Sequence, residues 1–182
     1  MKIVPEKSFQ AIDEHIAATD NPRHRAVLEN YREHMTAEIA GDLDRIMATM
    51  TPEPVYHTYG GANAPGSGPR GQGETRNFYT YIFDNGFNIL QKDIERLIVT
   101  DDCIFSEGWM YTVYPGKTLA ERGLDVDPSR HYLHTNRVAA ILPYEGEGTD
   151  VRMAGEDVYS LGGPTPESIA KLDDDEIPDA LR

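Results

Sequence analysis

The hydrophobic pattern changes its period once, near Gly86, and this change limits the folds open to the chain. Before Gly86, apolar side chains such as Tyr31, Met35 and Ile39 recur every three to four residues, which indicates helices. After it, apolar and polar residues alternate over four stretches, which indicates strands at 87–99, 103–114, 132–142 and 151–161. Helices followed by a strand meander predict an α+β fold, with three N-terminal helices packed on a curved, mostly antiparallel sheet. A pocket is expected between the two layers.

The helical part begins and ends at recognisable signals. Asn21-Pro22 starts the first helix, Gly41 ends it, and Asp42 caps a second helix that the prolines at 52 and 54 stop. A short aromatic strand follows at 55–59 and is separated by a Gly/Pro-rich loop from a third helix at 74–84.

The length of 182 residues predicts one domain with its own core. We expect an N-terminal arm at 1–20, the domain at 21–161 and a solvated acidic tail at 162–182. An insertion at 115–129 interrupts the strands and is expected to act as a lid.

The net charge of −14 argues against some classes of partner. It would repel phosphate backbones and anionic membranes, so neither nucleic acid nor a membrane is expected. A single cysteine, Cys103, forms no intrachain disulfide, and the sequence contains neither a signal-peptide pattern nor a long apolar run. The expected location is the cytoplasm.

Residues 31–83 carry a resemblance to a known family. They read as a helix, Ala40-Gly41-Asp42-Leu43-Asp44, an apolar helix, a strand ending at Gly60, a Gly/Pro loop and a helix with Arg76-Asn77-Phe78-Tyr79. This order resembles the nuclear transport factor 2-like superfamily, which includes ketosteroid isomerase, scytalone dehydratase, polyketide cyclases and cofactor-free diarylpropane lyases. The resemblance implies a cone-shaped α+β fold and a homo-oligomer, a dimer or trimer. It does not imply one reaction, because this fold hosts many chemistries.

The resemblance also implies site residues. The general base of the isomerases falls on His57, and the strand tyrosine of the dehydratases falls on His57 or Tyr59. The oxyanion-binding tyrosine falls on His34, with Tyr31 one turn earlier. The two dehydratase histidines fall on Glu107 and near His134 or Thr135.

The residues themselves suggest partners for these groups. Alternation puts Glu107, Trp109 and Tyr111 on one strand face, where an acid among aromatic rings has a raised pKa unless it pairs, for example with Arg137. We expect His134 and Asn136 to face the pocket. Glu156 and Tyr159 face opposite ways, so at most one of them lines it. No His or Cys cluster predicts a metal site.

These observations predict a cofactor-independent lyase or dehydratase that acts on a bulky, aromatic, hydroxylated small molecule. Its catalytic groups would be His57, Glu107, His134 and Tyr59, with Tyr31, His34, Trp109, Tyr111, Asn136 and Arg137 binding the substrate. Two alternatives stay open, an isomerase or cyclase and a non-catalytic module that binds a ligand or a protein.

Overall fold

The structure of the protein is a computed structural model, which describes residues 1–60, 64–178 and 181. Parts of the predicted Gly/Pro loop (61–63) and of the predicted tail (179, 180 and 182) lie outside the described residues.

The described helices and strands follow the predicted order. The helical elements are η1 (Pro5–Phe9), α1 (Gln10–Ala18), α2 (Pro22–Ala40), α3 (Leu43–Ala48), α4 (Gly71–Asp84) and α5 (Gly116–Glu121). The strands are β1 (Met50–Tyr59), β2 (Leu90–Val99), β3 (Cys103–Pro115), β4 (His131–Glu145), β5 (Arg152–Ser160) and β6 (Ile169–Lys171).

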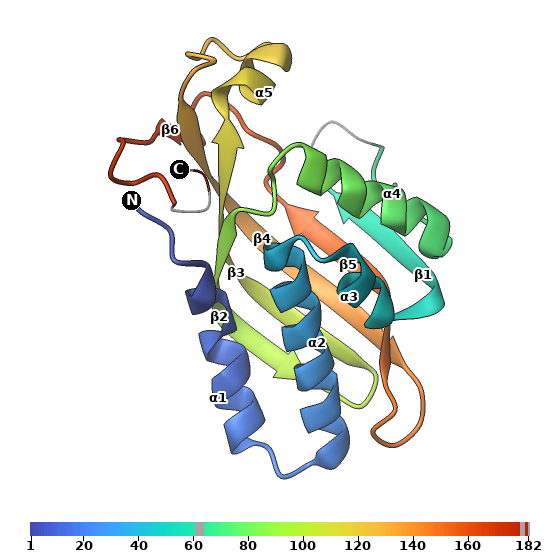
Figure 1. The fold of residues 1–182 in the computed structure, drawn as a ribbon. Coiled ribbons are helices and arrows are strands. Elements are labelled where there is room, and N and C mark those ends of the chain that lie inside the picture. Colours follow the sequence, from blue (N-terminus) through green and yellow to red (C-terminus); the bar gives the residue numbers. More distant parts are fainter. Residues whose placement is uncertain (61–63, 179–180, 182) are drawn as a thin grey trace.

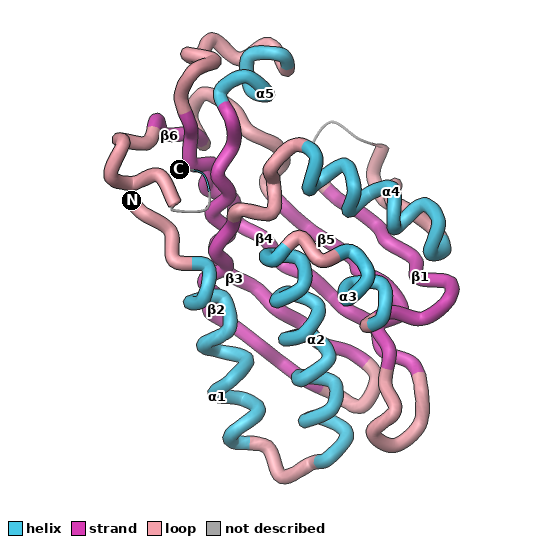
Figure 2. The backbone as a smooth tube through the Cα atoms, in the orientation of Figure 1, coloured by secondary structure: helices cyan, strands magenta, loops and turns pink. Residues whose placement is uncertain are grey.

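The sheet is mixed and open. Its strand order is β1-β5-β4-β3-β2, and β6 pairs with β4 outside this path. Only the β1–β5 pair among these is parallel; the other pairs are antiparallel. Figure 1 shows α1 to α4 on one face of the sheet, while α5 lies beyond the end of β3. The same two layers are separated by colour in Figure 2. This is the predicted α+β architecture.

Local signals explain where α2 begins and ends. The side chain of Asn21 accepts hydrogen bonds from the backbone N–H groups of Arg23 and His24, and Pro22 occupies the first turn. Gly41 ends the helix at a φ of 70°, a left-handed conformation that glycine adopts at little cost. The carboxylate of Asp42 then caps α3 by accepting from the N–H of Arg45 at 3.1 Å. These caps set where α2 and α3 begin and where α2 ends.

Bulges in two strands set the direction of the side chains that follow them. Between the pairs Ile141–Asp157 and Tyr144–Met153, β5 advances four residues while β4 advances three. The extra residue in β5 reverses the alternation, so that Glu156 turns to the helical layer. A second bulge lies in β2 between Ile94 and Arg96. The two bulges also bend the sheet around the space beneath the helices.

The predicted tail is only partly solvated, and this corrects the sequence-based expectation. Within it, β6 pairs with the first part of β4, and Leu172 is buried. Leu172 packs in a small cluster with Ile3 from the N-terminal arm and with Val113 and Leu133 from the sheet. Apolar side chains therefore attach both ends of the chain to the domain, while the division into arm, domain and tail stays a prediction.

Candidate active site

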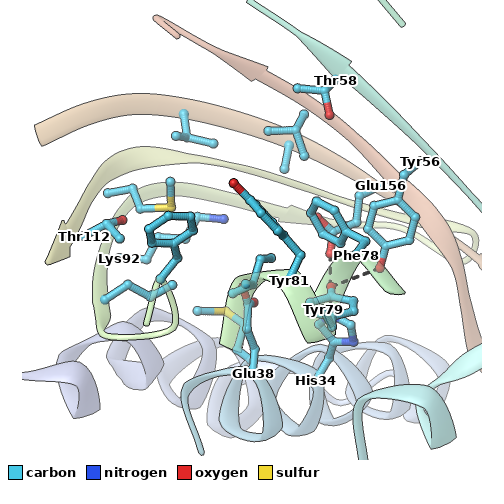
Figure 3. A pocket seen from close by; sticks show the side chains of 18 of the residues that line it. His34, Glu38, Tyr56, Thr58, Phe78, Tyr79, Tyr81, Lys92, Thr112 and Glu156 are labelled. Atoms are coloured by element: carbon cyan, nitrogen blue, oxygen red, sulfur yellow. Dashed lines mark hydrogen bonds and ion pairs between the residues drawn. The ribbon is translucent and has the colours of Figure 1, made fainter. Parts of the chain in front are cut away.

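A cavity of about 410 Å³ lies between the helices and the sheet. Side chains of α2 and α4 line one side, and side chains of β1 to β5 line the other. Most of the wall is apolar or aromatic, but it also contains Glu38, Lys92, Glu156 and the tyrosines 31, 56 and 79. Figure 3 shows Glu38 and His34 on the helical side, with Lys92, Tyr56 and Glu156 coming from the sheet. Such a space suits a small, largely apolar molecule.

Two carboxyl groups face this cavity and have shifted pKa values. Burial raises the pKa of Glu38 to about 7, against a smaller opposing effect of Lys92. Burial also raises the pKa of Glu156 to about 7, the charge of Glu38 raises it further, and Lys92 again opposes the shift. The Glu156 side chain keeps 19% of its surface accessible. Both groups can therefore gain or lose a proton near neutral pH.

Lys92 is the cation of the cavity. Its Nζ donates hydrogen bonds to Tyr31 Oη and to Ser106 Oγ, each at 3.0 Å. Burial alone would lower its pKa, but Tyr31, Glu156 and Glu38 outweigh burial, and the pKa is raised. Lys92 is thus an ammonium at neutral pH.

One cation and two carboxyl groups favour a shared proton. Lys92 can balance one buried carboxylate, whereas a second ionised carboxylate would be buried without compensation. At neutral pH the balanced state has one of Glu38 and Glu156 ionised and the other protonated. The cavity then contains both an acid and a base.

A chain of hydrogen bonds fixes the protonation of His34. Thr49 Oγ1 donates its only proton to the carbonyl of Ile46 at 2.6 Å, so it accepts from Nδ1–H of His34 at 2.8 Å. Burial lowers the pKa of His34 to about 3, so its Nε2 carries no proton and accepts from the hydroxyl of Tyr79 at 2.9 Å. Tyr79 Oη in turn lies 3.1 Å from Tyr56 Oη. Neutral His34 thus holds the hydroxyl of Tyr79 directly and that of Tyr56 through Tyr79.

The phenols at this end of the cavity stay protonated. Burial raises the pKa of Tyr56 and of Tyr79 well above the ordinary value, and the carboxyl charge of Glu156 adds to both shifts. Glu156 Oε1 lies 3.5 Å from His34 Nε2, next to the same chain. The phenols therefore supply hydrogen-bonding hydroxyls beside one of the two carboxyl groups.

Two of the residues predicted for the site, Tyr31 and His34, line the cavity. His57 and Tyr59 lie on the opposite face of β1, because Tyr56 and Thr58 are the residues that face inward. His57 Nδ1 is 2.6 Å from Asp157 Oδ1, and the Tyr59 ring stacks on Tyr159 at 4.7 Å. This corrects the expected placement of His57 and Tyr59.

The predicted facing of β3 is reversed in the structure. The cavity wall uses Met110 and Thr112, so Glu107, Trp109 and Tyr111 lie on the outer face. There Glu107 pairs with Arg96 and Arg137, which lower its pKa instead of leaving it raised. The guanidinium of Arg137 lies 5.3 Å from the Trp109 ring centroid.

The aromatic face of β3 lies outside because charged side chains cover it, among them Glu107 and Arg137. The guanidinium of Arg137 covers Trp109 on the outer face, whereas Met110 and Thr112 of the same strand line the cavity.

His134 and Asn136 are on the same face as the cavity, as expected, but neither lines it. They pair across the ladder with Thr112 and Met110, which do. The His134 ring lies 5.7 Å from the ring of Tyr114, edge to face, and burial lowers its pKa. The Asn136 side chain donates to the Gly162 carbonyl at 3.0 Å and accepts from Leu161 N–H at 3.2 Å. Both residues support the end of the cavity instead of contacting its interior.

Four residues of the cavity, Glu38, Lys92, Tyr56 and Tyr79, were not predicted from the sequence, and Glu156 was predicted without a role. A signal for Glu38 was present, since it lies one turn beyond His34 and two turns beyond Tyr31 on the same helix face. A polar residue on an otherwise apolar face is a marker for a site. For Glu156 the bulge hides the facing, because alternation counted from the start of β5 fails across it. Lys92 lies before the bulge in β2, and simple alternation puts it on the same face as Leu90.

Neither a membrane-spanning helix nor a metal cluster is found in the described part of the chain. Among residues 1–60, 64–178 and 181, no helix is both long and apolar enough to cross a lipid bilayer. No group of three or more His, Cys, Asp or Glu side chains among the same residues is arranged to hold a metal ion.

Helices on one face of an open, curved sheet, with a largely apolar cavity between the layers, define the nuclear transport factor 2-like class of α+β proteins. Within that class the chain belongs to the family of SnoaL-like domains, whose model matches residues 31–161. Members of this fold include polyketide cyclases and isomerases. No curated protein matches the sequence.

Solved structures share the fold at low sequence identity. A ketosteroid isomerase-like protein from Erwinia carotovora atroseptica is 16% identical, with 79% of this chain and 99% of that chain covered and a TM-score of 0.56. An NTF2-like protein from Anabaena variabilis is 10% identical, with 80% of this chain and 98% of that chain covered and a TM-score of 0.56. SalBIII, an epoxide hydrolase/cyclase-like enzyme of pyran ring formation in the polyether salinomycin, is 11% identical. The match covers 79% of this chain and 94% of that chain, with a TM-score of 0.51. At these identities the similarity extends to the fold alone.

Proposed function

We propose that the protein is a cofactor-independent enzyme that moves protons on a small, largely apolar molecule, and that its reaction is an elimination of the lyase or dehydratase type. One observation carries this proposal: Glu38 and Glu156, both with a pKa of about 7, line one apolar cavity together with Lys92. An acid and a base at the same substrate are what a concerted elimination needs.

In this proposal the ionised carboxylate of the pair removes a proton from a carbon of the substrate. The electron pair of that C–H bond becomes the new double bond. The protonated carboxyl of the pair gives its proton to the departing hydroxyl, which leaves as water. Lys92 stabilises the carboxylate before the reaction, and the hydroxyl groups near Tyr56 orient the oxygen atoms of the substrate.

The wall of the cavity supports an aromatic or otherwise flat substrate. Phe78, Tyr79 and Tyr81 come from a single helix, and Tyr31 and Tyr56 face them from other elements. Aromatic side chains offer large flat contact areas together with hydroxyl groups.

An isomerase or cyclase is the second candidate, and the same observation favours it. Glu38 affects the pKa of Glu156 through its charge, and both carboxyl groups line the same cavity, where one ligand could contact both. A proton taken from one atom and returned to another gives isomerisation, and a hydroxyl activated in this way closes a ring. Mass spectrometry separates the candidates, because elimination removes the mass of water and isomerisation conserves mass.

The test compares wild-type protein with four variants, Glu156→Gln, Glu38→Gln, Glu107→Gln and His57→Ala, on a panel of hydroxylated aromatic compounds in D₂O, without added cofactor. Wild-type protein is expected to convert a panel member or to exchange one of its C–H protons for deuterium. Glu156→Gln and Glu38→Gln should each reduce this rate by about 10² to 10⁴, the usual contribution of a general acid or base. Glu107→Gln, a matched change on the outer face, should retain the wild-type rate.

The outcome separates the proposed site from the one predicted from the sequence. Loss of activity in Glu107→Gln or in His57→Ala, with full activity in Glu156→Gln, would overturn the assignment of the acid and base. Binding of panel members without conversion or exchange by wild-type protein would support a non-catalytic binding module.

A further inference from the structure

Arg122 occupies the mouth of the cavity and is held there by aromatic side chains. It directly follows α5 in the insertion 115–129 and is exposed. Its Nη2 donates a hydrogen bond to Tyr81 Oη at 2.9 Å. The guanidinium carbon lies 5.0 Å from the ring centroid of Phe87 and 5.8 Å from that of Tyr114. These contacts orient a cation at the entrance, where Tyr81 is 52% exposed.

Arg122 differs from most arginines of this acidic chain in its partners. Among the residues that the structure describes, no carboxylate lies within salt-bridge distance of Arg122, whereas Arg32, Arg45 and Arg137 each pair with at least one. The chain has 31 acidic residues against 17 lysines and arginines, so carboxylates are plentiful. The absence of an acidic partner leaves the charge of Arg122 to interact with a ligand that enters the cavity.

The electrostatics of the cavity decide which end of a ligand lies at Arg122. At the inner end, one of Glu38 and Glu156 is ionised and balances the charge of Lys92, whose ammonium also donates to Tyr31 and Ser106. An anionic group of the ligand would be buried there without a compensating cation. An anion is therefore favoured at the mouth and disfavoured inside.

The spacing of the strand residues gives the length of such a ligand. Tyr114 contacts Arg122, and Met110 lies directly opposite Lys92 in the ladder. Tyr114 lies four positions after Met110 in β3, and this advance corresponds to roughly 13 Å along the strand. A body of two fused or linked rings fills this distance.

We propose that the substrate is an apolar carboxylic acid whose carboxylate binds Arg122 at the cavity mouth while its other end reaches Glu38 and Glu156. This inference rests on the proposed function for the chemistry at the inner end. The binding of the carboxylate does not depend on turnover and is tested separately. The planar guanidinium suits a carboxylate, with which it forms charge-assisted hydrogen bonds.

The experiment measures calorimetric binding of 4-biphenylcarboxylate and of the neutral 4-biphenylcarboxamide, which has nearly the same shape. Wild-type protein should prefer the carboxylate by about tenfold, as expected for a hydrogen-bonded charge pair, and the preference should shrink at high salt. Arg122→Met should abolish the preference while leaving the affinity for the carboxamide within about twofold. Arg122→Lys should retain part of it.

Two controls separate this proposal from the others. Arg152→Met removes the same charge from an exposed arginine that pairs with Asp150, and it should keep the preference. Glu156→Gln should keep it too, whatever happens to turnover, so that the substrate class and the acid-base pair can fail independently.

Three results would overturn the proposal: no preference in wild-type protein, a preference that survives in Arg122→Met, or an equal loss of affinity for both compounds in that variant. The last result would mean that Arg122 only fastens the insertion over the cavity. Failure of both compounds to bind wild-type protein would also count against this substrate class.

Discussion

Burial shifts the pKa values of the glutamates and of His34 in opposite directions. It raises the pKa of Glu38 and Glu156 from 4.5 to about 7 and lowers that of His34 from 6.5 to about 3. In both cases the neutral form is favoured, because a low-dielectric environment penalises charge. The site therefore keeps one titratable pair near neutral pH and holds the histidine beside it in a single protonation state.

These shifts predict how stability depends on pH. The folded protein binds the Glu156 proton more tightly than the unfolded chain does, so the stabilisation is complete below about pH 4.5 and is lost as the pH rises through about 7. For His34 the stabilisation is complete above about pH 6.5 and is lost as the pH falls toward 3. The two contributions have opposite slopes between pH 4.5 and 6.5.

Glu156→Gln should remove the pH dependence of stability that comes from Glu156 and leave the one that comes from His34. Relative to wild type, the free energy of unfolding of this variant should increase between pH 5 and pH 8, by up to about 3 kcal/mol for a shift of this size. Urea denaturation at the two pH values measures the difference. Glu147→Gln, a change at an exposed residue of the β4–β5 loop, should show no such increase. A pH-independent effect of Glu156→Gln would contradict the raised pKa.

At the scale of single elements, the bulge in β5 is what turns Glu156 inward. Gly155 precedes Glu156 with a φ of 145°, and a Cβ atom at this position would lie 1.8 Å from the carbonyl oxygen of Val55. Neither the backbone conformation nor the space between β1 and β5 accepts a side chain there. The bulge therefore depends on glycine.

Gly155→Ala should reduce the free energy of unfolding by roughly 3 kcal/mol or more, through backbone strain and separation of the two strands. Gly163→Ala is the matched control, because Gly163 is exposed and a Cβ atom there would have no neighbour within 4 Å; its effect should stay within about 1 kcal/mol. Chemical denaturation of both variants provides the comparison. Equal stability of the two variants would mean that the β1–β5 contact is not tight at Gly155.

Most elements could be predicted from the sequence, although β6 was not, and the facing of several side chains could not be predicted. Caps at Asn21 and Asp42 and the change of period near Gly86 are local signals, and they indicate the order of helices and strands. The predicted facing of β3 was wrong because its aromatic side chains lie outside, under the Glu107–Arg137 ion pair, which only the folded sheet brings together. A cap can be recognised from a few neighbouring residues, whereas an ion pair between two strands cannot be recognised from the sequence of either strand alone.

At the scale of the whole molecule, folding brings together three charged groups that are far apart in the sequence. Glu38 comes from α2, Lys92 from β2 and Glu156 from β5, and each affects the pKa of at least one other. The expected packing of helices on a curved sheet predicted the cavity that holds them, but not that Glu38 and Lys92 would line it. The expected homo-oligomer stays a prediction.

NMR titration of the glutamate side-chain ¹³Cδ signals shows whether Glu38 and Glu156 share a proton near neutral pH. Two signals should titrate with midpoints of about 7 and disappear one at a time in Glu38→Gln and Glu156→Gln. In Glu38→Gln the midpoint of Glu156 should also fall, because the charge of Glu38 contributes to its shift. If every glutamate instead titrates near 4.5, the cavity holds no acid-base pair and the proposed function is wrong.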